Sequence, residues 1–105
     1  MKAQIKIGDS FALPIQFYNT TNSEPVQITD DMQITCQIIN STGQTIAKPN
    51  ISRLQELGMI LLEVAASETQ HWKVGSAQFD IKLQIHDQVR HSQNIQFSIE
   101  RSITV

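Results

Sequence analysis

Apolar and polar residues alternate along much of this chain. The clearest case is the segment in which Phe79, Ile81, Leu83 and Ile85 are separated by polar side chains. Successive side chains of a strand point to opposite faces, so a period of two predicts a strand with one buried and one solvent-facing side. This half-buried pattern is typical of antiparallel sheets. The segments that we expect to be strands are 5–7, 11–17, 32–39, 44–48, 59–64, 77–86 and 89–100.

Polar and glycine-containing segments separate these expected strands about every 8–12 residues. We expect turns at 8–10, 19–25, 40–43 and 87–88. Short strands with turn signals at this spacing predict a β-sandwich or a β-barrel.

One segment lacks the alternation. Ser67 and Gln70 have the spacing of a capping box, in which the first side chain caps a helix and the second reaches back to the start of the helix. Val74 and Gly75 follow and would end the helix. We therefore expect one short helical turn near residues 67–73, crossing between two sheets.

The chain is poor in charge and rich in amides. Of its 105 residues 17% are charged, the net charge is −2, and 13 residues are glutamine, whereas an average protein has about 25% charged residues. The low net charge argues against disorder. The eight Lys and Arg residues are scattered singly, which argues against a nucleic-acid partner. Outward strand positions hold Gln16, Gln33, Gln37, Gln84 and Gln96, and amides cost less to desolvate than charges do, which hints at contact with another chain.

The length predicts a single domain that spans residues 1–105. Cys36 is the one cysteine, so no intrachain disulfide is expected. The longest apolar run, at 59–62, is far shorter than the roughly 20 residues of a membrane span. The N-terminal segment lacks the apolar stretch of a signal peptide. We therefore expect a cytoplasmic protein with no membrane partner.

Few side chains have a spacing that catalysis or metal binding would need. His86 and His91 flank the expected turn at 87–88, with Asp87 between them. A catalytic zinc site needs three protein ligands, so an exposed hairpin is favoured over a metal-dependent enzyme. Cys36 belongs to the apolar series of its strand, which predicts a buried side chain rather than a nucleophile. The two aspartates at 30–31 lack the spacing of a calcium loop. We expect no catalytic residue, metal or cofactor.

Trp72 is the one tryptophan of the chain. A tryptophan in a short crossover beside a sandwich is expected to cover the end of the core. The alternative is that Trp72 contacts a partner or stacks on a sugar, with Tyr18 as a second aromatic platform.

Three runs of sequence follow one another in a recognisable order. The first is Gly8-Asp9-Ser10-Phe11 at the start of an alternating strand. The second is Thr69-Gln70-His71-Trp72-Lys73-Val74-Gly75, followed by Phe79-Asp80-Ile81. The third is the closing segment 91–104. Together these runs resemble small phage- and prophage-encoded immunoglobulin-like β-sandwich proteins, whose domains occur in phage tails and baseplates. The chain departs from that pattern at Lys73-Val74, where a proline is common, and we expect no attached second domain.

This resemblance implies an all-β, immunoglobulin-like antiparallel sandwich of about seven or eight strands. The core positions that it implies are Phe11, Trp72, Phe79, Ile81, Phe97 and Ile103. The residues that it implies in turns or pinning strands are Gly8, Asp9, Gly75 and Asp80. It carries no catalytic residue.

The function that the resemblance implies is that of a non-enzymatic structural or assembly protein. Such a protein would be a virion adaptor of the tail or baseplate type, made in the host cytoplasm and then assembled into the virion. Its partners would be other virion or prophage proteins, or copies of itself in a homo-oligomer. A carbohydrate-binding module that uses Trp72 and Tyr18 is the alternative.

Overall fold

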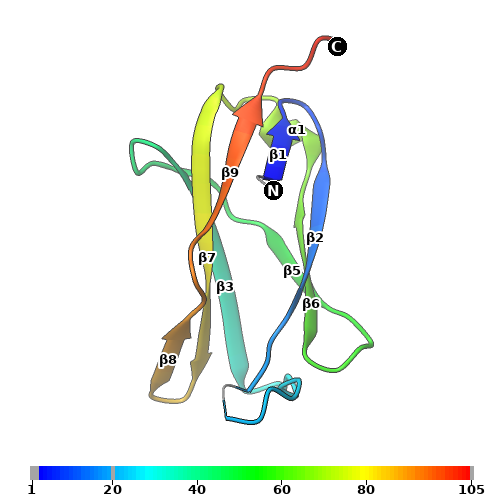
Figure 1. Ribbon diagram of the computed structural model, residues 1–105, viewed down its shortest axis with the longest axis vertical. Coiled ribbons are helices and arrows are strands. Elements are labelled where there is room, and N and C mark those ends of the chain that lie inside the picture. Colours follow the sequence, from blue (N-terminus) through cyan, green and yellow to red (C-terminus); the bar gives the residue numbers. More distant parts are fainter. Residues whose placement is uncertain (1–2, 20, 105) are drawn as a thin grey trace.

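The computed structural model describes residues 3–19 and 21–104, which form two β-sheets and one short helix (Figure 1). Sheet A has the strand order β1 (Ala3–Lys6), β9 (Ile95–Glu100), β7 (Gly75–Ile85), β3 (Met32–Asn40) and β4 (Thr45–Ala47), and β8 (Gln88–His91) also pairs with β7. Sheet B has the order β2 (Phe11–Gln16), β6 (Met59–Val64) and β5 (Asn50–Arg53). Helix α1 (Ala66–Thr69) connects β6 of sheet B to β7 of sheet A. The expectation of an all-β sandwich with one helical turn at the crossover is confirmed.

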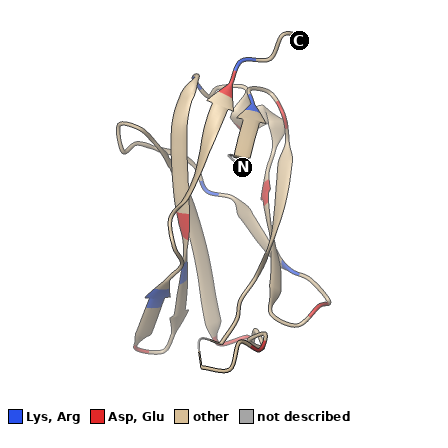
Figure 2. Ribbon diagram, viewed as in Figure 1, with Lys and Arg blue, Asp and Glu red and all other residues tan. Residues whose placement is uncertain are grey.

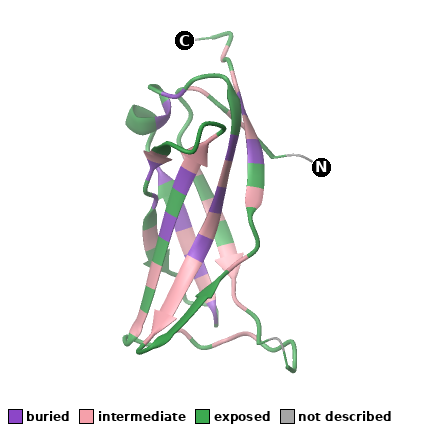
Figure 3. Ribbon diagram, turned by 90° about the vertical axis from the view of Figure 1, so that its left-hand side faces the viewer, coloured by how far each residue is buried: buried purple, intermediate pink, exposed green. Residues whose placement is uncertain are grey.

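The alternating side chains form one core between the two sheets, as the banding along the strands in Figure 3 shows. Cys36 and Ile38 of β3 lie directly opposite Ile81 and Phe79 of β7, so the apolar positions of neighbouring strands share one face. The buried apolar residues are Cys36, Ile38, Ala47, Ile60, Leu62, Val64, Trp72, Ala77, Phe79, Ile81, Phe97 and Ile99.

The aromatic residues expected in the core form a connected cluster at one end of the sandwich. The ring of Phe97 lies 6.3 Å from that of Phe11, 6.0 Å from that of Trp72 and 6.2 Å from that of Phe79, all in tilted arrangements. Phe11 is half-buried and its ring lies 6.1 Å from that of Trp72. Tilted pairs at these distances are favourable beyond the area that they bury.

The expectation that Ile103 belongs to this core is wrong. Its side chain is 93% exposed. The chain leaves sheet A after Glu100, at the last residue pair of β9 with β1, and continues away from the sandwich (Figure 1). Ile103 therefore has no sheet to pack against.

Several details of the predicted topology also differ from the structure. The structure has nine strands in its described residues, two more than the seven segments expected from the sequence. The expected strand 89–100 is divided into β8 and β9. Strand β5 was not expected, because it has too few apolar residues to show the alternation. The turn before β8 is at His86–Asp87, one residue earlier than expected, and His86 has a positive φ of 51°. Strand β1 pairs in parallel with β9, although every other strand pair is antiparallel as expected.

The capping box at the helix is not formed. Ser67 lies inside α1, and the residue before the helix is Ala65, which has no side chain that can cap it. The side chain that does organise this region is Thr69, which is 0% exposed. Its hydroxyl accepts a hydrogen bond from the Gly8 amide at 3.1 Å and donates one to the Asp9 carbonyl at 2.8 Å. Thr69 thereby fixes the chain where it passes from β1 to β2.

Gly58 occupies the tightest turn, just before β6. It has a φ of +75°, and the Phe17 amide donates to its carbonyl at 2.9 Å. A Cβ atom at this position would lie 2.7 Å from the Val26 carbonyl oxygen. Both the positive φ and the close backbone contact therefore require glycine.

Candidate functional site

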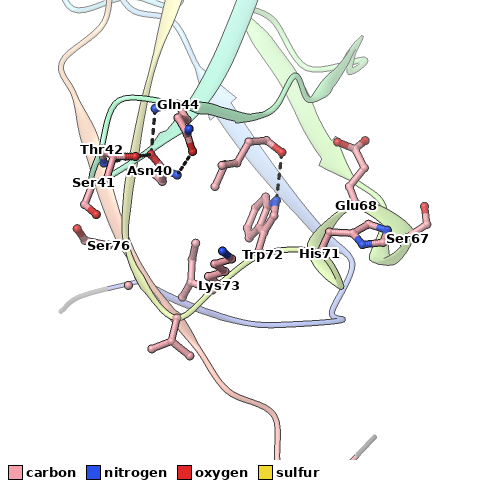
Figure 4. Close-up of a pocket in the computed structure, with 14 residues that line it drawn as sticks. Asn40, Ser41, Thr42, Gln44, Ser67, Glu68, His71, Trp72, Lys73 and Ser76 are labelled. Carbon is pink, nitrogen blue, oxygen red and sulfur yellow. Dashed lines mark hydrogen bonds between the residues drawn. The ribbon is translucent and has the colours of Figure 1, made fainter.

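A polar cleft lies at the end of the sandwich that α1 covers. We call it the Trp72 cleft, and it has a volume of about 620 Å³. One wall is the β3–β4 hairpin and the other is α1 with the segment that leads into β7 (Figure 4). Its lining is formed by Asn40, Ser41, Thr42, Gln44, Ile46, Ser67, Glu68, His71, Trp72, Lys73, Val74, Gly75, Ser76 and Ile99.

The hairpin wall is rigid because one amide side chain organises its turn. Asn40 Oδ1 accepts hydrogen bonds from the Thr42 amide at 3.1 Å, from Thr42 Oγ1 at 2.8 Å and from the Gln44 amide at 2.9 Å. Gly43, with a φ of +85°, completes the turn. Asparagine commonly stabilises turns in this way, so these contacts explain the hairpin without any ligand.

Trp72 forms the floor of the cleft rather than a platform in it. The side chain is 6% exposed, and its ring packs against Phe11 and Phe97. The indole Nε1 donates a hydrogen bond to the Ile46 carbonyl at 3.2 Å, shown dashed in Figure 4. The interpretation of Trp72 as a cover over the end of the core is therefore confirmed.

Tyr18 lies beside a different hollow. We call this the Tyr18 groove; it has a volume of about 610 Å³ and is lined by Phe17, Tyr18, Asn19, Thr21, Val26, Ile81, Leu83, Ile85, Gln88, Arg90, His91 and Ser92. Tyr18 is 57% exposed, and its hydroxyl donates to Gln16 Oε1 at 2.6 Å. The groove and the Trp72 cleft have no lining residue in common. The structure therefore does not bring Tyr18 and Trp72 together in one site.

The histidines and aspartates weighed as metal ligands are dispersed. His86 Nε2 lies 3.4 Å from Asp31 Oδ2, whereas His91 stands opposite Lys82 in the β7–β8 ladder. Asp30 pairs with Arg53 at 2.9 Å. A hydrogen bond from the Thr29 hydroxyl lowers the pKa of Asp31. Within residues 3–19 and 21–104, no group of three or more His, Cys, Asp or Glu side chains is arranged to hold a metal ion.

Cys36 lies in the core, as its sequence pattern predicts. It is 7% exposed, and burial, followed by the negative charge of Asp80, raises the pKa of its thiol to about 11. A thiol with such a pKa stays protonated at neutral pH, so Cys36 lacks the thiolate character of a nucleophile.

The outer face of sheet A is broad and consists mainly of uncharged polar side chains, with glutamines prominent among them. Gln33 of β3 lies directly opposite Gln84 of β7, and Gln78 of β7 lies opposite Gln96 of β9. We call this surface the amide face; its residues are Gln33, Thr35, Gln37, Gln78, Gln84, Gln96 and Ser98, with Asp80 and Lys82 among them and the opposed pair Lys6 and Glu100 at one end. Charged positions form isolated bands on this sheet (Figure 2). Two shallow hollows of about 160 and 240 Å³ border Gln78.

Comparisons with known proteins identify the fold. No family model matches the sequence, and no curated protein matches it. The crystal structure of CopC from Methylosinus trichosporium OB3b is similar, with a TM-score of 0.58 over 99% of this chain and 88% of that chain. The chain has the fold of a β-sandwich. At 10% sequence identity the likeness to CopC shows this fold alone, so the resemblance to phage proteins stays a prediction.

In the described part of the chain, no helix is long and apolar enough to span a membrane.

Proposed function

We propose that this β-sandwich is a non-enzymatic phage or prophage structural protein that acts by protein–protein contact. It serves as a virion adaptor of the tail or baseplate type, made in the host cytoplasm and then assembled with other virion proteins. The observation that carries this proposal is the amide face of sheet A, a wide surface whose outward side chains are mostly uncharged and polar.

The composition of this face suits burial against a partner. Interface cores are depleted of charged residues, because a charge that loses water without gaining a partner is expensive. Amides lose less on desolvation and offer both donors and acceptors to the facing surface. The paired arrangement of Gln33 with Gln84 and of Gln78 with Gln96 places four such groups on one continuous surface.

The arrangement of the sequence motifs supports the phage part of the proposal. Gly8 and Asp9 of the first motif are hydrogen-bonded to Thr69, the first residue of the second motif. Phe97 of the third motif packs against Trp72 of the second. The three runs on which the resemblance rests therefore form one structural unit, so they are residues that such a fold would need together.

Co-purification with the products of neighbouring genes tests this proposal. The chain is co-expressed with each flanking gene product, and complexes are separated by size-exclusion chromatography with light scattering. Gln33→Arg and Gln96→Arg place a charge on the amide face, and we expect each to weaken a complex at least tenfold. Gln55→Arg is the matched control, because Gln55 is an exposed glutamine in the loop before β6. Flanking genes without any virion protein, or a complex that all three variants form equally well, would overturn the proposal.

Carbohydrate binding through Trp72 and Tyr18 is the second candidate, favoured by the exposure of Tyr18 beside its groove. The burial of Trp72, which is 6% exposed, weighs against it, because stacking needs a free ring face. A glycan array decides between the two. Binding that Tyr18→Ala abolishes while the fold is kept would support this candidate.

A further inference from the structure

We propose that the open edge of β8 is the surface on which a second copy of this chain docks. The two β8 strands would pair antiparallel across a two-fold axis and join two copies of sheet A into one sheet. This inference rests on the proposed function only in assuming that the protein acts by assembly. It concerns the edge of sheet A, whereas other virion proteins are proposed to bind the amide face.

Strand β8 has an unpaired side. It pairs with β7 through residues 82–85, and all four of its residues are exposed. The Ser92 amide donates to the Ile81 carbonyl at 2.9 Å, and hydrogen-bonded pairs alternate along an antiparallel ladder. The backbone groups of Val89 and His91 therefore point away from β7, toward the open edge.

On this open side of β8, sheet A has room for one more strand. Strands β8 and β9 pair with the same side of β7, because β3 occupies the other side along residues 77–85. Beyond β9 the sheet continues with β1, whereas no described strand lies beyond β8. An added strand would therefore extend the sheet at the place where it is narrowest.

The other edges carry residues that discourage strand addition. Pro14 lies in β2, and the Phe17 amide donates to Gly58, so by alternation the proline nitrogen points to the open side of sheet B. β1 has Lys6, β5 has Arg53, and the three-residue β4 is followed directly by Lys48 and Pro49. Lysine, proline and short length are the usual protections of an edge. Strand β8 is as short as β1 and β5 and has Arg90, as β5 has Arg53, but it has no lysine and no proline, and Val89 at its centre is 46% exposed.

The polar side chains of β8 and of the turn before it are complementary to those of a second copy in one register. Pairing Val89 with Val89 of the copy places Asp87 of each chain opposite His91 of the other, and Gln88 opposite Arg90. Lys82 stands beside His91 in the ladder, so the incoming Asp87 carboxylate meets a positive surface. A neighbouring register also keeps Val89 and His91 hydrogen-bonded across the interface, but it places Arg90 opposite Arg90 of the copy. Like charges directly opposite each other are destabilising. A two-fold contact requires this kind of self-complementarity.

Four residues bury little area, so the dimer belongs to the weak class of interfaces. We therefore test it by sedimentation velocity on the purified full chain from about 10 μM to 1 mM. Wild type should show a rise in weight-average mass with concentration. Val89→Lys should raise the dimer dissociation constant at least tenfold, whereas Gln55→Lys, the same change at an exposed glutamine in the loop before β6, should leave it unaltered. Circular dichroism shows whether each variant is folded.

A charge exchange tests the register. Asp87→Lys alone and His91→Asp alone should each weaken the dimer, and the D87K/H91D double variant should restore it, because a lysine and an aspartate then face each other. A wild type that stays monomeric at 1 mM, or a dimer that Val89→Lys and Gln55→Lys affect equally, would overturn the inference. Neither result would count against binding of other virion proteins at the amide face. The Gln33 and Gln96 variants test that binding separately.

Discussion

Replacing Thr69 by valine removes one buried hydroxyl that connects two distant parts of the chain. Valine keeps the shape and the β-branch of threonine, so the packing around the side chain is retained. What is lost is the hydrogen bond from the Gly8 amide at 3.1 Å and the hydrogen bond to the Asp9 carbonyl at 2.8 Å, for which the Ala66 carbonyl at 3.3 Å is the more distant alternative acceptor of the one hydroxyl proton. The substitution therefore isolates the contribution of these two bonds to the free energy of unfolding.

The expected loss is about 1–2 kcal/mol. A neutral hydrogen bond contributes about 1 kcal/mol net, and two are removed. Gly8 and Asp9 are themselves exposed, so water reaches their freed backbone groups and the larger cost of an unsatisfied buried group does not apply. For a domain of this size, 1–2 kcal/mol corresponds to a fall in Tm of roughly 5–15 °C.

Urea unfolding and amide hydrogen exchange measure the two consequences. Thr69→Val should lower the unfolding free energy and remove the protection of the Gly8 amide. Thr69→Ser loses a methyl group but keeps the hydroxyl, so it should preserve that protection. Thr35→Val, on the exposed face of β3, should change stability by less than about 0.5 kcal/mol. If Thr69→Val leaves both stability and Gly8 protection unchanged, the hydroxyl does not fix the crossover and our reasoning is refuted.

Three further predictions concern other sites. Gly58→Ala should destabilise by about 1 kcal/mol or more beyond Gly43→Ala, because both have positive φ but only Gly58 has a carbonyl oxygen 2.7 Å from the new Cβ; equal denaturation midpoints would contradict this. The Cys36 thiol has a pKa of about 11 in the folded protein. It should therefore react with a disulfide reagent at pH 8 at least 100-fold more slowly in the folded than in the denatured protein. Fast reaction of the folded protein would show that the thiol is accessible. The Asp31 carboxyl has a pKa below its ordinary 3.8 in the folded state, so its ionised form stabilises the fold above that value and this stabilisation is lost as the pH falls through the folded pKa. The difference in stability between wild type and Asp31→Asn should therefore shrink between about pH 5 and pH 2 in urea titrations, and a difference that stays constant would count against it.

Alternation predicted most strands because the core needs one apolar face on each of them. It failed at the junction of β8 and β9. Val89 and Ile95 are an even number of residues apart, so a continuous strand would place both on one face. In the structure Val89 pairs with Gln84 on the outer face, whereas Ile95 pairs with Phe79 on the core face. The irregular segment between them changes which alternate residues face the core. No residue type in that segment predicts this change.

The candidate site was only partly predictable for a related reason. The position of Trp72 followed from the presence of a single tryptophan beside a crossover. The role of Thr69 did not, because its partners Gly8 and Asp9 are about 60 residues away and a hydroxyl has no sequence periodicity. Strand direction is equally invisible to alternation, so the parallel pairing of β1 could not be inferred.

The parallel pairing of β1 and β9 has a mechanical consequence. A force that pulls the chain before β1 away from the chain after β9 acts in opposite directions along two neighbouring parallel strands. The ladder between Ala3–Lys6 and Phe97–Glu100 is then loaded in shear. All of its hydrogen bonds must yield together, whereas strands pulled apart from one end would lose them one by one. A protein mounted in a larger structure by its two ends would therefore resist extension at this pair of strands, and its lifetime under tension would be set by the rate of unfolding.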